Sequence, residues 1–183
     1  MFRSLTSRVN ALEKVCKFTS FKTRKMIANG IAMSKLMYLI QWWGGCPNYL
    51  LDYLQVLQNR AARAVTRKGW RTPTEKLLQQ CGWLSVRQLV HYHRLVLVFQ
   101  VKENGRPRYF KEQFSASFPY RTRLASGRGI RRGDHYHHQV TLSSFFNSAA
   151  VNWNLLPISI RNSLTQTQFK NRLKNWIKIN VPI

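Results

Sequence analysis

Acidic residues are scarce in this sequence of 183 residues, which has only 6 Asp and Glu against 30 Lys and Arg. The six carboxylates stand singly along the chain, and none follows Asp134. Hydrolysis by paired carboxylates and phosphoryl transfer by two metal ions both need two or three acids at one point. The sequence therefore argues against enzymes of these classes, and we expect no catalytic residue, no bound metal and no cofactor.

Cysteines and long apolar runs are scarce as well. Cys16, Cys46 and Cys81 are odd in number and widely spaced, which excludes a disulfide framework or a closed zinc motif and favours reduced thiols. The most apolar run, residues 36–46, is about half as long as a membrane span. Residues 1–17 alternate apolar and charged side chains, unlike a secretory signal. We expect an intracellular protein, nuclear or cytoplasmic, that does not span a membrane.

One group of histidines has the composition of a metal site. His135, His137 and His138 follow Asp134, and alternate histidines on a strand would point to one face. No cysteine stands nearby to complete a tetrahedral site, so histidines exposed to solvent or facing phosphate are the favoured interpretation.

Positive charge and aromatic side chains are abundant instead. The formal net charge is +24 with a pI near 11.2, while 44% of the residues are hydrophobic and 13% are aromatic. A disordered basic tail would be poor in aromatics, so the chain is expected to fold. Self-repulsion of so many cations favours a polyanion as partner, and interleaved rings suit unpaired bases. Nucleic acid fits both features. Membrane-surface binding fits less well, because the cations do not lie opposite one apolar stripe.

The pattern of apolar residues predicts a mostly α fold. Helical periodicity covers residues 4–17, 22–43, 49–67, 74–81 and 86–102, which gives a helical bundle over about residues 5–102. A basic, glycine-bearing loop or short β-hairpin is expected over 103–142, with a strand at 136–142. Two or three further helices are expected in a C-terminal segment within 143–183, with helical periodicity over 143–153 and 165–178. The expected domains are therefore 1–102, 103–142 and 143–183.

The candidate nucleic-acid-binding residues come from three basic groups. Phosphate contacts need cations only, whereas Trp70, between Gly69 and Arg71, is the tryptophan best placed to stack on a base rather than pack in the core. The candidates are Arg60, Arg63, Arg67, Lys68, Trp70 and Arg71 in the first group, Arg121, Arg123, Arg128, Arg131 and Arg132 in the second, and Lys170 and Lys174 in the third.

An ordered series of short phrases resembles the region that follows the polymerase core in reverse transcriptases of non-LTR (LINE-type) retrotransposons. The phrases occur in that family's order over nearly the whole chain. They are Ser34-Lys35-Leu36 with Tyr38 and Trp43-Gly44, Gln58-Asn59-Arg60-Ala61-Ala62-Arg63, Gly82-Trp83-Leu84-Ser85-Val86, Phe145-Phe146, Trp153-Asn154-Leu155-Leu156-Pro157 with Ile160-Arg161, and Phe169-Lys170 with Leu173-Lys174-Asn175-Trp176.

The resemblance implies a thumb and basic tail that hold the RNA–DNA template-primer, with the polymerase core supplied by a separate chain or segment. The family's Tyr/Phe-Ala-Asp-Asp motif does not occur in this sequence, and Asp52 and Asp134 match nothing catalytic. The endonuclease and the zinc knuckles of some relatives do not occur either. The expectation is a truncated copy, a domesticated piece or a fragment of an RNA-directed DNA polymerase that does not polymerise on its own.

Two other functions stay open at this point. A structural RNA-binding protein of ribosomal or packaging type would have a similar composition and would bind its own RNA. A stand-alone cationic protein that acts on membranes or on protein partners would need no nucleic acid. Sequence does not distinguish RNA, DNA and hybrid as the ligand.

Overall fold

The computed structural model describes residues 2–105, 108 and 145–183, and 79% of these residues are helical with none in a strand. The mostly α fold expected from the sequence is confirmed. The described chain divides into two compact units, Met1–Leu89 with Val181–Ile183, and Val90–Asn180. The division between Leu89 and Val90 falls inside a helix that continues to Asn104. The domain boundary expected after residue 102 lies in the last turn of the same helix and stays a prediction. The expected strand at 136–142 lies outside the described residues.

The first unit begins with two helices that run in the same direction along each other. These are α1 (Phe2–Val15), followed by the short 3-10 helix η1 (Cys16–Phe18), and α5 (Asn48–Thr66). Contacts pair Thr6 with Tyr53, Glu13 with Arg60, and Lys17 with Arg67, so residue numbers rise together on both helices. Leu5, Val9 and Leu12 are buried on α1, as are Leu54, Leu57, Ala61 and Val65 on α5.

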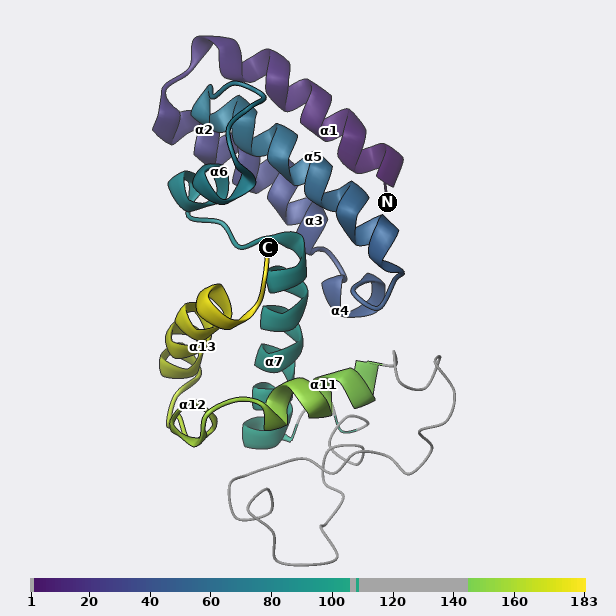
Figure 1. The fold of residues 1–183 in the computed structure, drawn as a ribbon, viewed down its shortest axis with the longest axis vertical. Coiled ribbons are helices and arrows are strands. Elements are labelled where there is room, and N and C mark those ends of the chain that lie inside the picture. The colour runs from purple at the N-terminus through teal and green to yellow at the C-terminus, as the bar shows by residue number, and fades with distance from the viewer. Residues whose placement is uncertain (1, 106–107, 109–144) are drawn as a thin grey trace, which may run out of the picture. The chain divides into compact units, whose positions relative to one another are not determined.

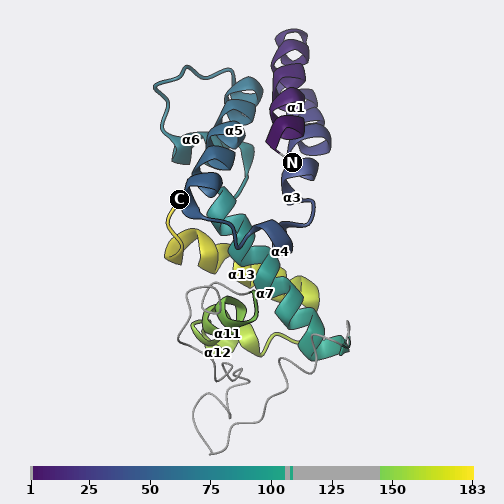
Figure 2. The ribbon, with the colours of Figure 1, turned by 90° about the vertical axis from the view of Figure 1, so that its right-hand side faces the viewer.

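The segment between α1 and α5 is an interrupted helix (Figures 1 and 2). It comprises α2 (Phe21–Ala28), the π-helix η2 (Asn29–Met33), α3 (Ser34–Met37) and α4 (Ile40–Trp43). The expected single helix over 22–43 is wrong at Tyr38 and Leu39. Tyr38 is extended and Leu39 is left-handed, with φ 51°, and these two residues interrupt the helix before α4.

Prolines and caps set the remaining helix ends. Pro47 precedes α5, and Pro73 precedes α6 (Thr74–Cys81), which ends at left-handed Gly82 with φ 68°. A capping box opens α7 (Val86–Asn104), where Ser85 Oγ accepts from the backbone N–H of Gln88 and Gln88 Oε1 accepts from the backbone N–H of Ser85.

The second unit has an aromatic core. It contains most of α7, α11 (Phe145–Asn154), the four-residue α12 (Ile158–Arg161) and α13 (Gln166–Asn180). Phe169 of α13 is fully buried, stacks on Phe99 at 4.3 Å between ring centroids, and lies 5.8 Å from Trp153. The helix α12 is the third helix that the sequence left open, and no range could be predicted for it because one turn after Pro157 is too short to show periodicity.

Candidate nucleic-acid interface

Two arginines tie three chain segments together at one end of the first unit. Arg24 is buried, and its Nε donates to the Val65 carbonyl at 2.7 Å while Nη1 donates to the Thr19 carbonyl. Arg67 Nη2 donates to the carbonyls of Lys17 at 2.6 Å and Cys16 at 3.2 Å. These guanidinium groups satisfy carbonyls that helix ends leave without partners. The end of α1, the start of α2 and the end of α5 are thereby fixed beside one another.

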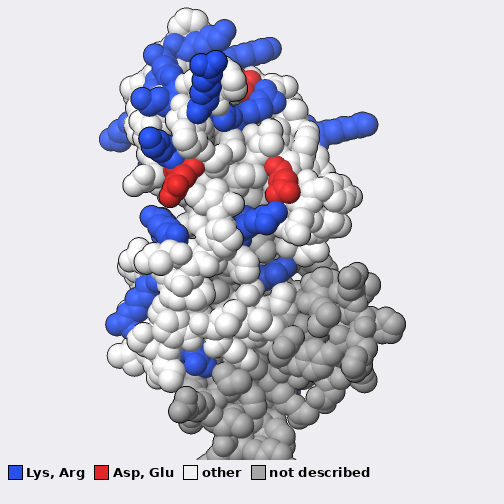
Figure 3. All heavy atoms as spheres, in the orientation of Figure 1, with Lys and Arg blue, Asp and Glu red and all other residues white. Residues whose placement is uncertain are grey.

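Further cations surround this junction. We call the whole group the basic end, and Figure 3 shows Lys and Arg gathered on this part of the surface with few acids among them. Lys25 is half-buried and the others are exposed. The basic end comprises Lys14, Lys17, Lys22, Lys25, Arg67, Lys68 and Arg71.

The positive charge of the basic end affects the pKa of two buried thiols. Burial raises the pKa of Cys16, and the charges of Arg24 and Arg67 oppose that rise. Burial also raises the pKa of Cys81 to about 11, opposed by Lys25. In both cases burial outweighs the nearby cations, so the thiols are protonated at neutral pH and serve as apolar packing rather than as nucleophiles.

The first group of candidate residues separates into paired and outward-facing cations. Arg60 forms a two-pronged ion pair with Glu13, at 3.1 Å from Nε and 2.9 Å from Nη2, and also donates to Asn10. Arg63 Nη2 donates to the Trp70 carbonyl at 3.2 Å. Lys68 and Arg71 are exposed. Among the described residues, Lys68 forms no hydrogen bond or ion pair.

Trp70 lies on the surface beside the basic end. Its side chain is 77% exposed, and the Arg71 guanidinium carbon lies 5.0 Å from the ring centroid. An indole that packed in the core would be covered, so the core interpretation of Trp70 is wrong. The ring and its stacked guanidinium offer a flat, cationic surface of the kind on which bases stack.

The third group lies on α13 of the second unit. Phe169, Leu173 and Ile177 form the buried face of this helix, and Lys170, Lys174 and Lys178 follow each by one residue. Lys170 is half-buried, and the pKa of His93 is lowered first by burial and then by the charge of Lys170. Lys174 and Lys178 are exposed.

The second group, Arg121, Arg123, Arg128, Arg131 and Arg132, lies outside the described residues, and so do Asp134 and the three histidines after it. Within residues 2–105, 108 and 145–183, no three His, Cys, Asp or Glu side chains come close enough to hold a metal ion. In the same described part, no helix has both the length and the apolar character needed to cross a bilayer.

Sequence reasoning missed most of the basic end. Lys14, Lys17, Lys22 and Lys25 are not among the candidate residues named from the sequence. Only the long-range bonds of Arg24 and Arg67 reveal that they share one surface with Lys68 and Arg71. The available signal was the density of Lys and Arg around the turn at 16–20, next to a helix that ends in Arg67-Lys68.

Comparison with known proteins adds no relative. No protein-family model, no curated protein sequence and no solved structure matches this chain.

Proposed function

We propose that this protein is a non-catalytic nucleic-acid-binding segment that grips a template-primer duplex through its phosphates, without reading base sequence. This is the role of the thumb and tail that its sequence resembles in non-LTR retrotransposon reverse transcriptases. The polymerase chemistry would then come from a separate core, and the protein would act in the nucleus or cytoplasm, where its nucleic acid is found.

The basic end is the observation that carries this proposal. Seven cations belong to three segments that the hydrogen bonds of Arg24 and Arg67 hold together. The nearest acid on α1, Glu13, is already paired with Arg60. A prearranged cationic surface of this kind suits a polyanion, because binding releases condensed counterions without a cost for assembling the site.

The side chains at the basic end also suit binding without sequence preference. Lysine ammonium groups and the Arg71 guanidinium bind phosphate oxygens, which are the same in every sequence. Trp70 adds a ring that stacks on any base, where a strand end or an unpaired base presents one. Direct readout would need these side chains to reach base edges in a groove, where arginine and lysine bind guanine and amide side chains bind adenine.

A salt titration with paired variants tests the proposal. Binding to an RNA–DNA hybrid, duplex DNA and single-stranded RNA is measured by fluorescence anisotropy for the wild type and for Lys68→Gln/Arg71→Gln. Because each lost phosphate contact lowers the salt slope by about 0.9 on B-form DNA, this double variant should lower it by about 1.8. The matched control is Arg8→Gln/Lys35→Gln, which removes the same charge elsewhere on the unit.

The outcomes separate the candidate functions. Tight binding to hybrid and duplex, with a steep salt slope that only the basic-end variant reduces, supports the thumb assignment. An equal loss in both double variants would mean that net charge alone drives binding, and would refute an interface at the basic end. A strong preference for one structured RNA would favour a structural RNA-binding protein instead. Absence of binding to all three would direct attention to membranes or protein partners.

A further inference from the structure

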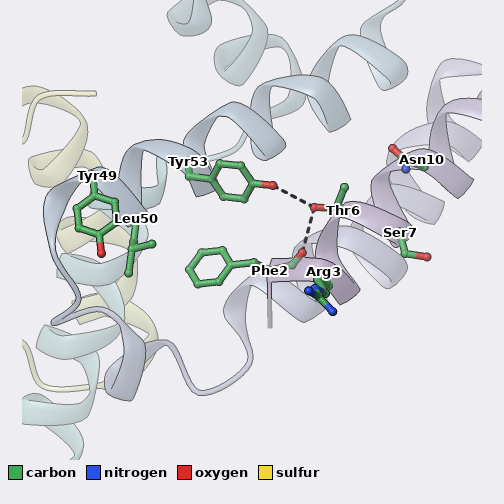
Figure 4. A pocket seen from close by; sticks show the side chains of 8 residues that line it. All are labelled: Phe2, Arg3, Thr6, Ser7, Asn10, Tyr49, Leu50 and Tyr53. Carbon is green, nitrogen blue, oxygen red and sulfur yellow. Dashed lines mark hydrogen bonds between the residues drawn. The ribbon is translucent and has the colours of Figure 1, made fainter.

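A groove lies at the opposite end of α1 and α5 from the basic end. Its volume is about 750 Å³, within the range of small-ligand sites. Figure 4 shows it between the first turns of the two helices. The residues that line it are Phe2, Arg3, Thr6, Ser7, Asn10, Tyr49, Leu50 and Tyr53.

Aromatic rings gather at one end of the groove. The rings of Phe2 and Tyr53 meet edge to face, with centroids 5.7 Å apart. Thr6 Oγ1 donates to the Phe2 carbonyl and lies 3.5 Å from the Tyr53 hydroxyl, which fixes that pair. Tyr49 is 70% exposed, and Figure 4 shows its ring apart from the other two. The groove therefore offers one anchored pair of rings and one open ring.

Polar groups without partners line the rest of the groove. Among the described residues, the Arg3 guanidinium and the hydroxyls of Ser7 and Tyr49 form no hydrogen bond or ion pair. Asn10 uses its Oδ1 to accept from Arg60, which leaves its amide nitrogen as a donor. No Asp or Glu lines the groove. An anionic ligand with a flat ring and several acceptors would satisfy this set of groups.

The groove leads toward the basic end along α1. Arg3, Ser7, Asn10, Lys14 and Lys17 recur at intervals of three or four residues, so they form one polar stripe along α1 and η1. From Arg3 to Lys17 the stripe is about 20 Å long, at 1.5 Å per residue. A duplex whose axis lies along the stripe has roughly six phosphates of each strand over this length, at about 3.4 Å of helix axis each. One nucleic-acid strand could thus follow the stripe from the basic end to the groove.

We propose that the groove binds an unpaired nucleotide at the end of a strand whose duplex part is held at the basic end. The base stacks against Tyr49 beside the Phe2–Tyr53 pair, and Arg3 binds the adjoining phosphate. This inference rests on the proposed function for its duplex site, and it adds a preference for duplexes that carry a single-stranded extension. An aromatic side chain of a protein partner would stack on the rings of the groove but would give Arg3 no anion to bind.

The test compares a blunt RNA–DNA hybrid with the same hybrid carrying a single-stranded extension of about ten nucleotides, long enough to cover the stripe. Stacking of one base is worth a factor of about ten in affinity, so the extension should tighten binding about tenfold. Tyr49→Ala and Arg3→Gln should each lose most of that gain, and Tyr49→Ala should leave the affinity for the blunt hybrid unchanged. Tyr49→Phe keeps the ring and should keep the gain.

The matched control is Tyr38→Ala, which removes another exposed tyrosine, 62% exposed and outside the groove. Quenching of 2-aminopurine placed in the extension reports stacking directly, and Tyr49→Ala should abolish it. The inference is overturned if the extension does not raise the affinity of the wild type. It is also overturned if Tyr49→Ala keeps the gain in affinity, or if Tyr38→Ala loses as much of it as Tyr49→Ala does.

The two proposals fail in different ways. Binding of the blunt hybrid with no gain from the extension refutes the groove alone and leaves the thumb assignment standing. If the protein does not bind the blunt hybrid but quenches 2-aminopurine in the isolated extension strand, and Tyr49→Ala abolishes that quenching, duplex binding at the basic end is refuted. The groove is then supported as a binding site for single strands.

Discussion

The Glu13–Arg60 ion pair predicts a substitution that strengthens nucleic-acid binding while it weakens the fold. Arg60 stands among the phosphate-binding candidates, yet its guanidinium is occupied by both oxygens of Glu13 and by Asn10. Glu13→Gln removes the competing carboxylate and leaves the hydrogen bond to Asn10. We therefore expect Arg60 to become available to a phosphate.

The magnitudes follow from the exposure and geometry of the pair. The two side chains are 37% and 39% exposed, so the pair is worth at most about 1 kcal/mol of folding free energy. Its loss should lower the unfolding temperature by about 2–4 °C in a chain of this size. One new phosphate contact should steepen the salt slope on duplex DNA by about 0.9. A charged hydrogen bond of about 1.5 kcal/mol would raise affinity roughly tenfold.

The assay is fluorescence anisotropy with duplex DNA at several KCl concentrations, combined with thermal unfolding. Arg60→Gln should lower stability by a similar amount and leave the salt slope nearly unchanged, because Arg60 is already occupied in the wild type. The double variant Glu13→Gln/Arg60→Gln has the wild-type net charge and should return to the wild-type slope.

One result would refute the reasoning directly. If Arg60→Gln alone lowered the salt slope as much as Lys68→Gln does, Arg60 would have to leave Glu13 and contact phosphate in the complex. An unchanged slope in Glu13→Gln would show instead that the position of Arg60 lies outside the nucleic-acid footprint.

Three further predictions concern the fold. Phe169→Ala should destabilise the second unit by about 3–5 kcal/mol, since the ring is fully buried between two aromatic partners, and urea unfolding would show this loss. Leu39→Gly should raise stability by about 1 kcal/mol in the same measurement, because the left-handed backbone costs leucine more than glycine and the side chain is half exposed. Burial lowers the pKa of both His91 and His93, so the unfolded chain takes up protons first as pH falls below about 6.5. The urea midpoint should therefore fall between pH 7.5 and pH 5.5, and His91→Gln/His93→Gln should flatten that dependence.

Much of the helical fold could be predicted because its signals are local. The helices α5, α6 and α13 begin and end within about two residues of the predicted limits, since apolar periodicity, prolines and glycines mark them within a single stretch of sequence. The break at Leu39 could not be predicted. A leucine is a poor marker for a left-handed residue, and the apolar pattern continues through it to Ile40.

The candidate site could be predicted only in part, because its decisive contacts are remote in sequence. Arg60 and Glu13 are 47 residues apart, and Arg67 reaches a carbonyl 50 residues away. No local pattern separates an arginine that binds a carboxylate or a carbonyl from one that faces solvent. Trp70 was singled out as the tryptophan best suited to stacking because a glycine and an arginine flank it, and its side chain is exposed, while stacking on a base stays a prediction. The groove joins residues of α1 and α5, and no local motif marks it.

These internal bonds limit how strongly salt can affect binding. Each unit holds half of the chain's 30 Lys and Arg and half of its 6 Asp and Glu, so composition alone suggests a very large number of phosphate contacts. Arg24, Arg60 and Arg67 are already engaged by carbonyls or by a carboxylate. Of these three arginines only Arg67 belongs to the basic end, so six of its seven cations remain to bind phosphate. Because each phosphate contact contributes about 0.9 to the salt slope, this surface should give a slope of about 5. A slope far above that value would mean that the basic groups outside this surface also contact the duplex, or that the arginine bonds which hold the basic end together open when nucleic acid binds.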